Sequence, residues 1–320
     1  MNAAIEIKNL QKIYENGLEA LKRINLSIPE GSFYGLLGPN GAGKTTTIGI
    51  ITGLVNITGG SATIMGYDSV KDFRQARKLI GLSPQELNFD VFFSMEELLE
   101  LQAGYYGLST KTAKERTALI LEQFGLTEKR KSRARELSGG MKRRIQIAKA
   151  LVHDPPIVIL DEPTAGVDIE LRHMLWGYLQ KINKEGKTIL LTTHYIEEAE
   201  HLCETVSIID DGNIIATDSP DKLTNSHGMS GVEITLSSNS KNLDINPWIS
   251  KKINGKIHVD TTEPEKDMAG IISRITDQGG TIENVHIYRS SLEDVFMKLT
   301  GKSLKDDAES IIVKESLLDV

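Results

Sequence analysis

The feature that most constrains the fold of this chain is the glycine-rich stretch GPNGAGKT, residues 38–45, which lies between the strand-like FYGLLG and a helical pattern. Glycines at 38, 41 and 43 allow backbone N–H groups to turn inward, and the start of a helix adds its positive dipole end. Such a loop is suited to binding phosphate. The alternative is an ordinary glycine turn, which the flanking strand and helix patterns disfavour.

Charged and hydroxyl side chains complete this loop. Lys44 supplies a positive charge for the β- and γ-phosphates of a nucleotide, and Thr45 offers its hydroxyl to Mg2+. We expect these residues of the stretch to contact the nucleotide: Gly38, Pro39, Asn40, Gly41, Ala42, Gly43, Lys44, Thr45 and Thr46.

Short β-rich segments alternate with helical patterns along the first two thirds of the chain. This alternation is typical of an α/β fold with a mainly parallel sheet, in which ligands bind at the carboxyl ends of the strands. We therefore expect the phosphate chemistry at that edge of the sheet. The segments expected to form strands are residues 4–10, 33–38, 157–161, 188–194 and 206–210.

Two adjacent acids, Asp161 and Glu162, follow the apolar pattern IVIL. Successive residues at a strand end point in different directions, so the two carboxylates can take different roles. Asp161 is placed to hold Mg2+, directly or through water, and Glu162 to orient or deprotonate a water molecule aimed at the γ-phosphate. Taken alone, such a pair is more often a helix cap or loop, but the phosphate-binding loop upstream reverses that preference.

His194 follows the apolar strand pattern TILLTT, which predicts that it lies at the same edge of the sheet. An imidazole there can donate a hydrogen bond to a γ-phosphate. The alternative is a structural histidine at a strand end. The other six histidines have no comparable context.

A second glycine-rich helix start, LSGGMKRR, occupies residues 137–144. The hydroxyl of Ser138 and the N–H groups of Gly139 and Gly140 suit a phosphate, although the upstream loop already serves one nucleotide. We expect the basic run KRR at 142–144 to form a solvated helix face, and direct contact with phosphate is the minor alternative.

Composition limits the classes of protein to which the chain can belong. With 320 residues, of which 39% are hydrophobic, it is long enough for one large domain and a smaller one. Its apolar runs are well below the roughly 20 residues of a membrane span, and its start lacks a signal-peptide pattern, so we expect a cytoplasmic location. The single Cys203 excludes an internal disulfide, and a net charge of -7 disfavours nucleic acid as the main partner.

These motifs together carry a specific family resemblance. GPNGAGKTT, then LSPQE, LSGGM, ILDEPTAGVD and TTH occur in the order and spacing of the ATP-binding subunits of ABC transporters. The ending SLEDVFMKLTGKSL resembles the ABC-2 export group, which includes daunorubicin-resistance and YadG-type ATPases. The resemblance implies a P-loop NTPase core of ABC type with a helical subdomain insert, and an ATPase that powers a membrane exporter by opening and closing as a dimer.

The resemblance also assigns roles within one subunit. It implies that Tyr14 stacks on adenine and that Gln85 links Mg2+ to the permease. The catalytic residues would then be Gln85, Glu162 and His194, and the ligands of Mg2+ would be Thr45, Gln85 and Asp161.

A second copy of the chain completes the site in this family. Two subunits would close head to tail around two ATP molecules, so that each LSGGM segment contacts the nucleotide of the partner. The residues contributed in trans would be Ser138, Gly139, Gly140 and Asp168. Met141 departs from the commonest family ending, LSGGQ, and cannot form hydrogen bonds as an amide would.

The sequence leaves two questions about partners open. A separate permease would hold the subunit at the inner face of the membrane near Gln85, where Phe89, Phe92 and Phe93 could line a groove for a permease helix. Equally, these aromatics could fill the core of the helical insert. A rival function is that of a soluble ABC-type ATPase acting as a mechanical or regulatory module without transport. The single P-loop and the absence of sustained heptads disfavour the mechanical form, and the presence of both Asp161 and Glu162 disfavours the regulatory form.

The sequence predicts three parts of the chain. Residues 1–227 form the ATPase domain, with its helical insert at about 86–153, which opens at a capping box of Ser94 and Glu97. Residues 228–301 form a small α+β accessory domain. Its predicted elements are strands in VEITLSS, GKIHVDTT and TIENVHIYR, a helix at about 264–277, and a last helix from a capping box of Ser290 and Glu293 to Gly301; the tail, 302–320, is either a helix or disordered.

Overall fold

The computed structural model describes residues 2–90, 92–228, 230–237, 246–248, 250–253, 256–261 and 263–302. The chain divides into two compact units, Met1–Thr217 and Asp218–Val320. The division lies before helix α8 (Pro220–His227), whereas the sequence analysis placed that segment in the first domain. The reason is that α8 packs against α10 (Leu292–Thr300), and Lys298 Nζ donates to the carbonyl of His227 over 2.8 Å.

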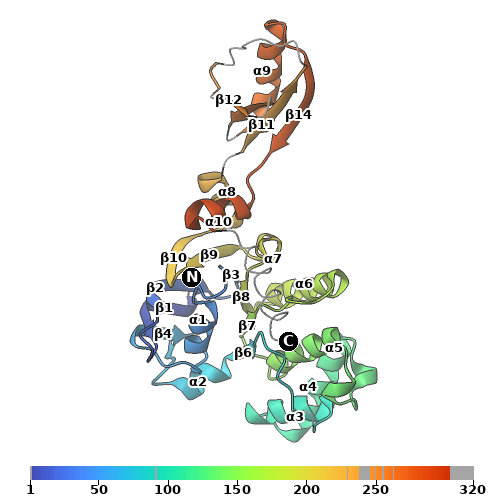
Figure 1. Ribbon diagram of the computed structural model, residues 1–320. Helices are drawn as coiled ribbons and strands as arrows, with labels where there is room; N and C mark the ends of the chain where they lie inside the picture. Colours follow the sequence, from blue (N-terminus) through green and yellow to red (C-terminus); the bar gives the residue numbers. More distant parts are fainter. Residues whose placement is uncertain are drawn as a thin grey trace, which may run out of the picture. The chain divides into compact units, whose positions relative to one another are not determined.

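A six-stranded sheet forms the centre of the first unit and confirms the predicted α/β core (Figure 1). Its pairs from β9 through β6 are parallel. The three inner strands β3, β8 and β7 are buried at every residue, as expected for a parallel sheet covered on both faces. In spatial order the strands are β10 (Asn213–Asp218), β9 (Thr205–Asp210), β3 (Phe33–Leu37), β8 (Thr188–Thr193), β7 (Ile157–Asp161) and β6 (Ile80–Ser83).

The first predicted strand, residues 4–10, does not belong to this sheet, and its expected place in a mainly parallel sheet is wrong. It lies in a separate antiparallel sheet, because a loop of only five residues connects β1 to β2 and so permits only antiparallel pairing. The strands of this sheet, in spatial order, are β2 (Glu19–Pro29), β1 (Ala3–Ile13), β4 (Gly59–Ile64) and β5 (Tyr67–Asp68).

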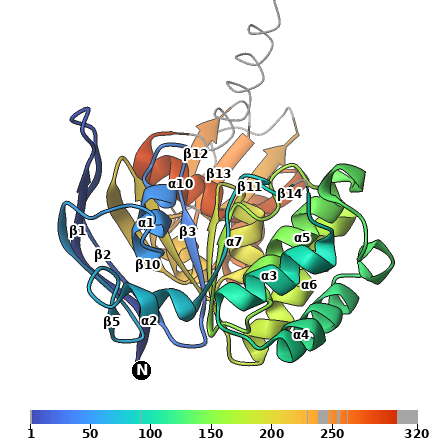
Figure 2. The same cartoon turned by 90° about the horizontal axis from the view of Figure 1, so that it is seen from below.

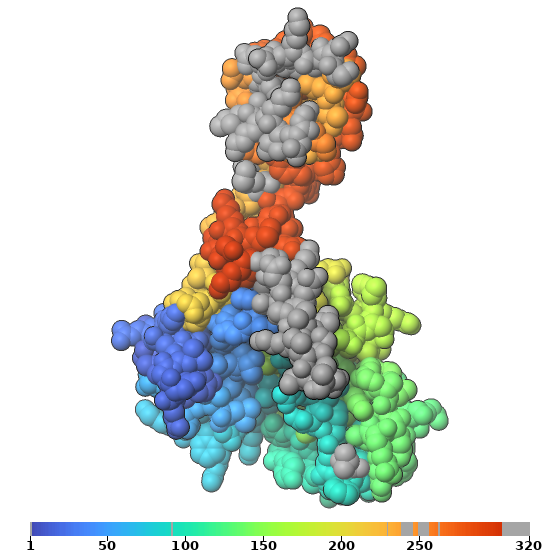
Figure 3. Space-filling model, in the orientation of Figure 1, coloured from blue at the N-terminus to red at the C-terminus, as the bar shows by residue number. Residues whose placement is uncertain are grey.

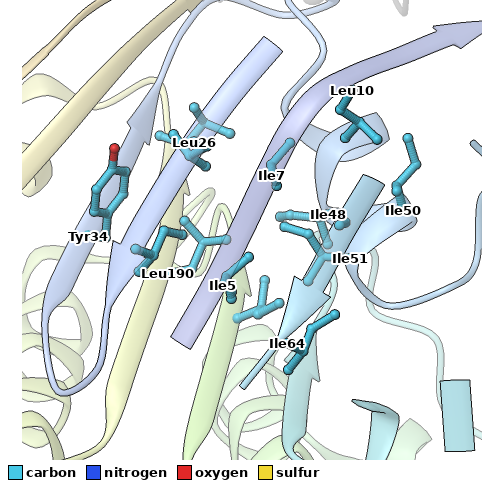
Figure 4. Close-up of a cluster of buried hydrophobic side chains, with 14 of the residues drawn as sticks. Ile5, Ile7, Leu10, Leu26, Tyr34, Ile48, Ile50, Ile51, Ile64 and Leu190 are labelled. Carbon is cyan, nitrogen blue, oxygen red and sulfur yellow. The ribbon is translucent and has the colours of Figure 1, made fainter. Parts of the chain in front are cut away.

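Helix α1 (Lys44–Ile51) begins at the phosphate-binding loop and packs in one hydrophobic core with both sheets. Figure 4 shows Ile48 and Ile51 of this helix on the side towards Ile5 of β1 and Ile50 near Leu10, with Leu190 of β8 in the same cluster. Full burial of such side chains contributes about 1.5–3 kcal/mol each. The loop is thus anchored at its helical end by apolar contacts with β1 and β4 as well as with the parallel sheet.

A helical insert follows β6, as predicted. It comprises α3 (Met95–Tyr105), α4 (Thr110–Gln123) and α5 (Gly139–Leu151), with short 3-10 turns between α4 and α5. The Ser94 hydroxyl accepts from the N–H of Glu97 and the Glu97 carboxylate accepts from the N–H of Ser94, which confirms the predicted capping box.

The insert forms its own side of the first unit. In Figures 2 and 3 the helices α3 to α5 lie on the side opposite to β1, β2 and β5. Three further helices connect the strands of this unit: α2 (Phe73–Lys78), α6 (Ile169–Lys184) and α7 (Ile196–Leu202).

Close contact between β6 and α5 fixes one edge of the insert on the sheet. A Cβ atom at Gly81 would lie 2.0 Å from the carbonyl oxygen of Ala150 and 2.8 Å from Pro155, so only glycine allows the strand and the helix to approach this closely. The loop that follows β6 therefore starts from a point held directly against α5.

The second unit contains the predicted α+β pattern. An antiparallel sheet pairs β11 (Gly231–Leu236) with β13 (Lys256–Asp260) and β14 (Ile282–Tyr288), and α9 (Pro264–Asp277) spans the residues expected for it. Ile271 and Ile275 of α9 pack in one core with β11 and β13. A further strand, β12 (Ser250–Ile253), was not predicted from the sequence and pairs with β13.

The capping box of the last helix lies one residue later than predicted. Ser291 and Asp294, not Ser290 and Glu293, exchange hydrogen bonds between side chain and backbone, because an aspartate at the third helical position reaches back as a glutamate would. The helix ends at Gly301, as predicted, with a φ of 70°. The predicted tail lies outside the described residues beyond Lys302.

Candidate functional site

The phosphate-binding loop joins the carboxyl end of β3 to α1. Gly43, which caps α1, has a φ of 110°, and a Cβ atom there would lie 2.9 Å from the carbonyl oxygen of Ala20. At Gly38 a Cβ atom would lie 2.3 Å from the carbonyl oxygen of Ile209. The loop needs glycine at these two positions because neighbouring backbone leaves no space for a side chain.

The side chain of Lys44 reaches back across the phosphate-binding loop. Its side chain is 5% exposed, and Nζ donates to the carbonyls of Gly38 over 2.7 Å and Pro39 over 3.1 Å. Nζ also lies 3.5 Å from Oε1 of Glu162. A cation held within hydrogen-bonding distance of the loop backbone is in position to neutralise a phosphate bound there.

Asp161, at the end of β7, lies close to two hydroxyl groups. Thr192 Oγ1 donates to its Oδ1 over 2.5 Å, and Thr45 Oγ1 donates to its Oδ2 over 3.3 Å. Burial raises the pKa of Asp161 and the charge of Glu162 adds to this, while the two hydroxyl groups oppose it. Because burial leaves the Asp161 carboxylate with little water around it, the carboxylate is a strong ligand for a cation.

The donor set around Asp161 fits Mg2+. Hydroxyl and carboxylate oxygens are the hard ligands that Mg2+ prefers, and it commonly takes only one or two carboxylates and completes its shell with water and phosphate oxygens. Within the described part of the chain no group of three or more His, Cys, Asp or Glu residues forms a metal cluster. Thr45 and Asp161 would therefore hold the ion together with the nucleotide.

Glu162 has a strained backbone at the turn that follows β7. Its φ is 49°, in the left-handed region that costs non-glycine residues about 1–3 kcal/mol, and its N–H donates to the carbonyl of Thr192 over 3.1 Å. This conformation turns the side chain of Glu162 away from that of Asp161 and towards the residues around the pocket. The two adjacent acids thus have different partners, as the sequence predicted.

Three side chains from distant parts of the sequence converge on the Glu162 carboxylate. Gln85 Nε2 donates to Oε2 over 3.0 Å, while His194 Nδ1 and Lys44 Nζ lie 3.2 and 3.5 Å from Oε1. His194 Nδ1 makes no hydrogen bond within the described structure, so its relation to Glu162 is one of close approach.

The protonation of Glu162 reflects opposing effects. Burial alone would raise its pKa, but the neighbouring His194 and Lys44 together outweigh burial and lower the pKa below its usual value. The side chain is 4% exposed and still favours the ionised form, which is the form that can take a proton from water.

A pocket of about 190 Å³ joins the loop to these residues. Its lining includes Tyr14, Lys44, Gln85 and Glu162, which the sequence analysis assigned to one site. The Tyr14 hydroxyl lies 3.2 Å from Thr46 Oγ1, and Lys12 Nζ lies 4.8 Å from the centre of its ring. The aromatic side chain thus borders the phosphate-binding loop beside Thr46.

The residues expected to act in trans do not line this pocket among the residues described. Ser138 caps α5 and accepts from the N–H of Met141 over 3.3 Å, while Asp168 caps α6 and accepts from the N–H of Leu171 over 2.8 Å. Ser138, Gly139 and Asp168 are exposed. The first turn of α5 thus presents a hydroxyl and free N–H groups to the surface.

The predicted solvated face at residues 142–144 is wrong for two of its three members. Arg143 is 4% exposed and donates to the carbonyls of Pro84 and Gln85, and Arg144 donates to the carbonyl of Phe124 over 2.9 Å. A charge pattern on a helix does not reveal carbonyl groups that a loop brings to it. Arg143 and Gln146, which both donate to carbonyls of the loop at residues 84–86, were therefore not predicted as site residues.

The aromatic residues after Gln85 lie largely on the surface. Phe92 is 77% exposed and Phe93 is 36% exposed, so the alternative in which they fill the core of the insert is wrong for both. Phe89 is partly buried. A second pocket of about 170 Å³ is lined by Thr52, Leu54, Arg77, Ile80, Leu82 and Tyr106.

Thr192 is a further site residue that was not predicted from the sequence. Its position two residues before His194 at the end of an apolar strand was a usable signal, because parallel strands place their ends together. The register pairs Asp161 directly with Thr192, which gives this threonine its contact with the carboxylate.

Comparison with known proteins gives consistent matches. Residues 21–165 match the family model described as ABC transporter. The Nod factor export ATP-binding protein I of Cupriavidus pinatubonensis is 37% identical over 314 residues, covering 96% of this chain and 93% of that protein. The daunorubicin resistance ATP-binding protein DrrA2 of Streptomyces coeruleorubidus is 34% identical, covering 93% of this chain and 95% of that protein.

A solved structure shares the fold of the first unit. It is the dimeric structure of a post-hydrolysis state of the ATP-binding cassette MJ0796 bound to ADP and Pi. It is 30% identical, with a TM-score of 0.63, and covers 67% of this chain and 98% of that one.

The contact between Thr192 and Asp161 generates a prediction. Replacing Thr192 with valine keeps the shape of the side chain and removes a donor that lowers the pKa of Asp161. The pKa should rise further above its ordinary value, so protons should compete with Mg2+ at higher pH than in the parent protein. We expect the Mg2+ concentration needed for half-maximal binding of a non-hydrolysable ATP analogue to increase about 10-fold at neutral pH, with a larger increase at lower pH.

Thr188→Val is the matched control for this experiment, since Thr188 is equally buried at the other end of β8 and accepts from the N–H of Gly31. It should leave the Mg2+ dependence unchanged. An equal shift in both variants would show that Thr192 does not act through Asp161.

Proposed function

Because this chain belongs to the ABC transporter family, as an ATP-binding subunit, we propose that two copies close around two molecules of ATP and open after hydrolysis, driving an exporter of ABC-2 type. The chain is an ATPase whose relatives serve export and drug resistance. The observation that carries the proposal is the convergence of Gln85, His194 and Lys44 on the carboxylate of Glu162 beside the phosphate-binding loop.

Within one subunit, the loop and Lys44 bind the phosphates, Thr45 and Asp161 hold Mg2+, and Tyr14 stacks on adenine. The contact of Thr45 with Asp161 supports a shared metal ligand, and the place of Tyr14 beside Thr46 supports an adenine site next to the loop. When bound, Mg2+ neutralises charge on the phosphate oxygens. The chain itself must then bring a water molecule into line with the γ-phosphate.

Glu162 acts as the base in this proposal. Its lowered pKa keeps the carboxylate ionised, its strained backbone fixes its direction, and Gln85 occupies one of its oxygens. His194 lies beside the other oxygen and can donate to the γ-phosphate. Because the site is buried, an oriented carboxylate acts on water more strongly than it would in solvent.

The second copy completes each site. Ser138, Gly139, Gly140 and Asp168 contact the nucleotide of the partner, since they lie outside the pocket of their own chain. The free N–H groups and the dipole at the start of α5 support an anion site that a second molecule supplies. Dimers are also found for the related cassette bound to ADP and Pi.

A separate membrane protein carries the cargo in this proposal. No helix among the described residues has the length and apolarity to cross a bilayer. The names of the relatives support a permease partner, and the exposed Phe92 and Phe93, which follow Gln85, support a contact at that surface. The subunit would then be held at the membrane through its permease, and movement of Gln85 would connect the ATP site to transport.

The role of Glu162 leads to the first prediction from this proposal. Glu162→Gln should retain ATP binding, because size and shape are kept, while turnover should fall by about 100-fold or more because the base is lost. Steady-state phosphate release and equilibrium ATP binding measure the two effects. Lys44→Ala serves as the comparison that should lose ATP binding itself, and normal turnover in Glu162→Gln would remove Glu162 as the base.

The shared site leads to a second prediction. Ser138→Arg places a large side chain at the start of α5 and should reduce turnover of the purified dimer at least 10-fold, with ATP binding to the isolated chain retained. Ser109→Arg is the matched control, because Ser109 is an equally exposed cap at the start of α4. The two variants should lose similar helix-capping energy, about 1 kcal/mol, so unchanged turnover in Ser138→Arg would exclude the contact in trans.

The proposed permease surface can be tested by crosslinking. A photoreactive residue at position 92 should crosslink to a co-expressed six-span permease from the same gene neighbourhood. The control position is Ile215, 42% exposed on β10, the edge strand opposite β6. Crosslinks at both positions or at neither would contradict a contact specific to the loop after Gln85.

A further inference from the structure

Arg143 is a buried cation on α5 whose partners belong to the loop that carries Gln85. Its Nη1 donates to the carbonyl of Gln85 over 3.1 Å and to the carbonyl of Pro84 over 3.4 Å. It also donates to Oε1 of Gln146 over 3.0 Å. Burying a guanidinium is costly unless its donors are satisfied, and most of the acceptors here are backbone carbonyls of one short loop.

Gln146, one turn further along α5, binds the same loop. Its Nε2 donates to the carbonyl of Pro84 over 2.7 Å and to that of Glu86 over 2.5 Å. The carbonyls of three consecutive residues, 84 to 86, are therefore all held by two side chains of one helix. We name this set of hydrogen bonds from Arg143 and Gln146 to residues 84–86 the α5 latch.

The latch connects the two ends of the proposed catalytic arrangement. At one end Ser138 caps α5, and Arg143 lies five residues later, about 7.5 Å along the helix axis. At the other end the side chain of Gln85 donates to Glu162 over 3.0 Å. Since a short helix moves as a rigid body, a shift of α5 must move the backbone of Gln85 with it.

The charge of Arg143 also reaches the acids at the end of β7. Burial lowers the pKa of Arg143, while the charges of Glu162 and Asp161 oppose that shift, so the guanidinium lies within electrostatic range of both carboxylates. Arg144 offers a contrast on the same helix, because it donates to the carbonyl of Phe124 in the helical insert.

We infer that Arg143 is a positioning residue for ATP hydrolysis. Together with Gln146 it ties the backbone of Gln85 to α5. When Ser138 engages the partner's nucleotide, α5 therefore moves Gln85 relative to Glu162. The inference rests on the proposed roles of Ser138 and Glu162. In this arrangement the latch transmits dimer closure to the base. When α5 moves, the hydrogen bond from the Gln85 amide to the Glu162 carboxylate changes in length and direction. No atom of Arg143 needs to touch ATP.

The test is Arg143→Met, which keeps much of the length of the side chain and removes its donors. Its kcat for ATP hydrolysis should fall about 10-fold while KM for ATP stays within about twofold, because binding is retained and only the arrangement around Glu162 is altered. Arg143→Lys, which can still donate to a carbonyl, should recover part of the lost kcat. Arg144→Met is the matched control and should change kcat less than twofold.

A second measurement separates positioning from a general loss of structure. Gln85→Ala removes the side chain through which the latch acts, so Arg143→Met should add no further decrease in that background. Should Arg143→Met fail to fold by thermal melting, Gln146→Met replaces it in the same cycle. Unchanged kcat in Arg143→Met, or an equal decrease with and without Gln85, would overturn the inference.

Failure of the inference is distinguishable from failure of the proposed function. If Glu162→Gln retains turnover in the same assay, the assigned base is wrong whatever Arg143 does. If Glu162→Gln abolishes turnover and Arg143→Met leaves it unchanged, the base stands and the latch does not transmit closure.

Discussion

Parallel pairing of β3, β8 and β7 is the constraint on which the rest of the site depends. The register places Leu37, the last residue of β3, beside Thr193, and Asp161 beside Thr192. Because parallel strands end at one edge of the sheet, the phosphate-binding loop and the acids meet there, and Thr45 and Lys44 of the loop come within reach of Asp161 and Glu162. The burial of these strands on both faces makes that register costly to shift, since a slip would disrupt the close packing of side chains on both faces.

The helical insert adds a second part of the chain to this edge. Gly81 brings β6 against Ala150 of α5, and the α5 latch then fixes the loop that carries Gln85. The side chain of Gln85 therefore approaches Glu162 from the insert, while Lys44 and His194 approach it from the sheet. A site built from two bodies can change when one of them moves, which suits an ATPase whose chemistry must drive motion in another protein.

Much of the site could be predicted because its residues occur in short contiguous motifs with local physical reasons. The glycines of the loop, the acids after β7 and the histidine after β8 each follow an apolar strand, so their common edge followed from the α/β pattern. The direction of β1, the contact of Thr192 with Asp161 and the burial of Arg143 could not be predicted in this way. Each depends on partners far away in the sequence, and Arg143 in particular looks like one more basic residue in a solvated run.

The sequence by itself determined the α/β core, the helical insert and the family, because glycine spacing and strand–helix alternation reflect local backbone geometry. Only the tertiary structure decided which side chains satisfy which buried groups: Gln85 on Glu162, Thr192 on Asp161, and Arg143 on the carbonyls of Pro84 and Gln85. These pairings arise because removing polar groups from water requires replacement partners, and the fold alone determines which partners are within reach.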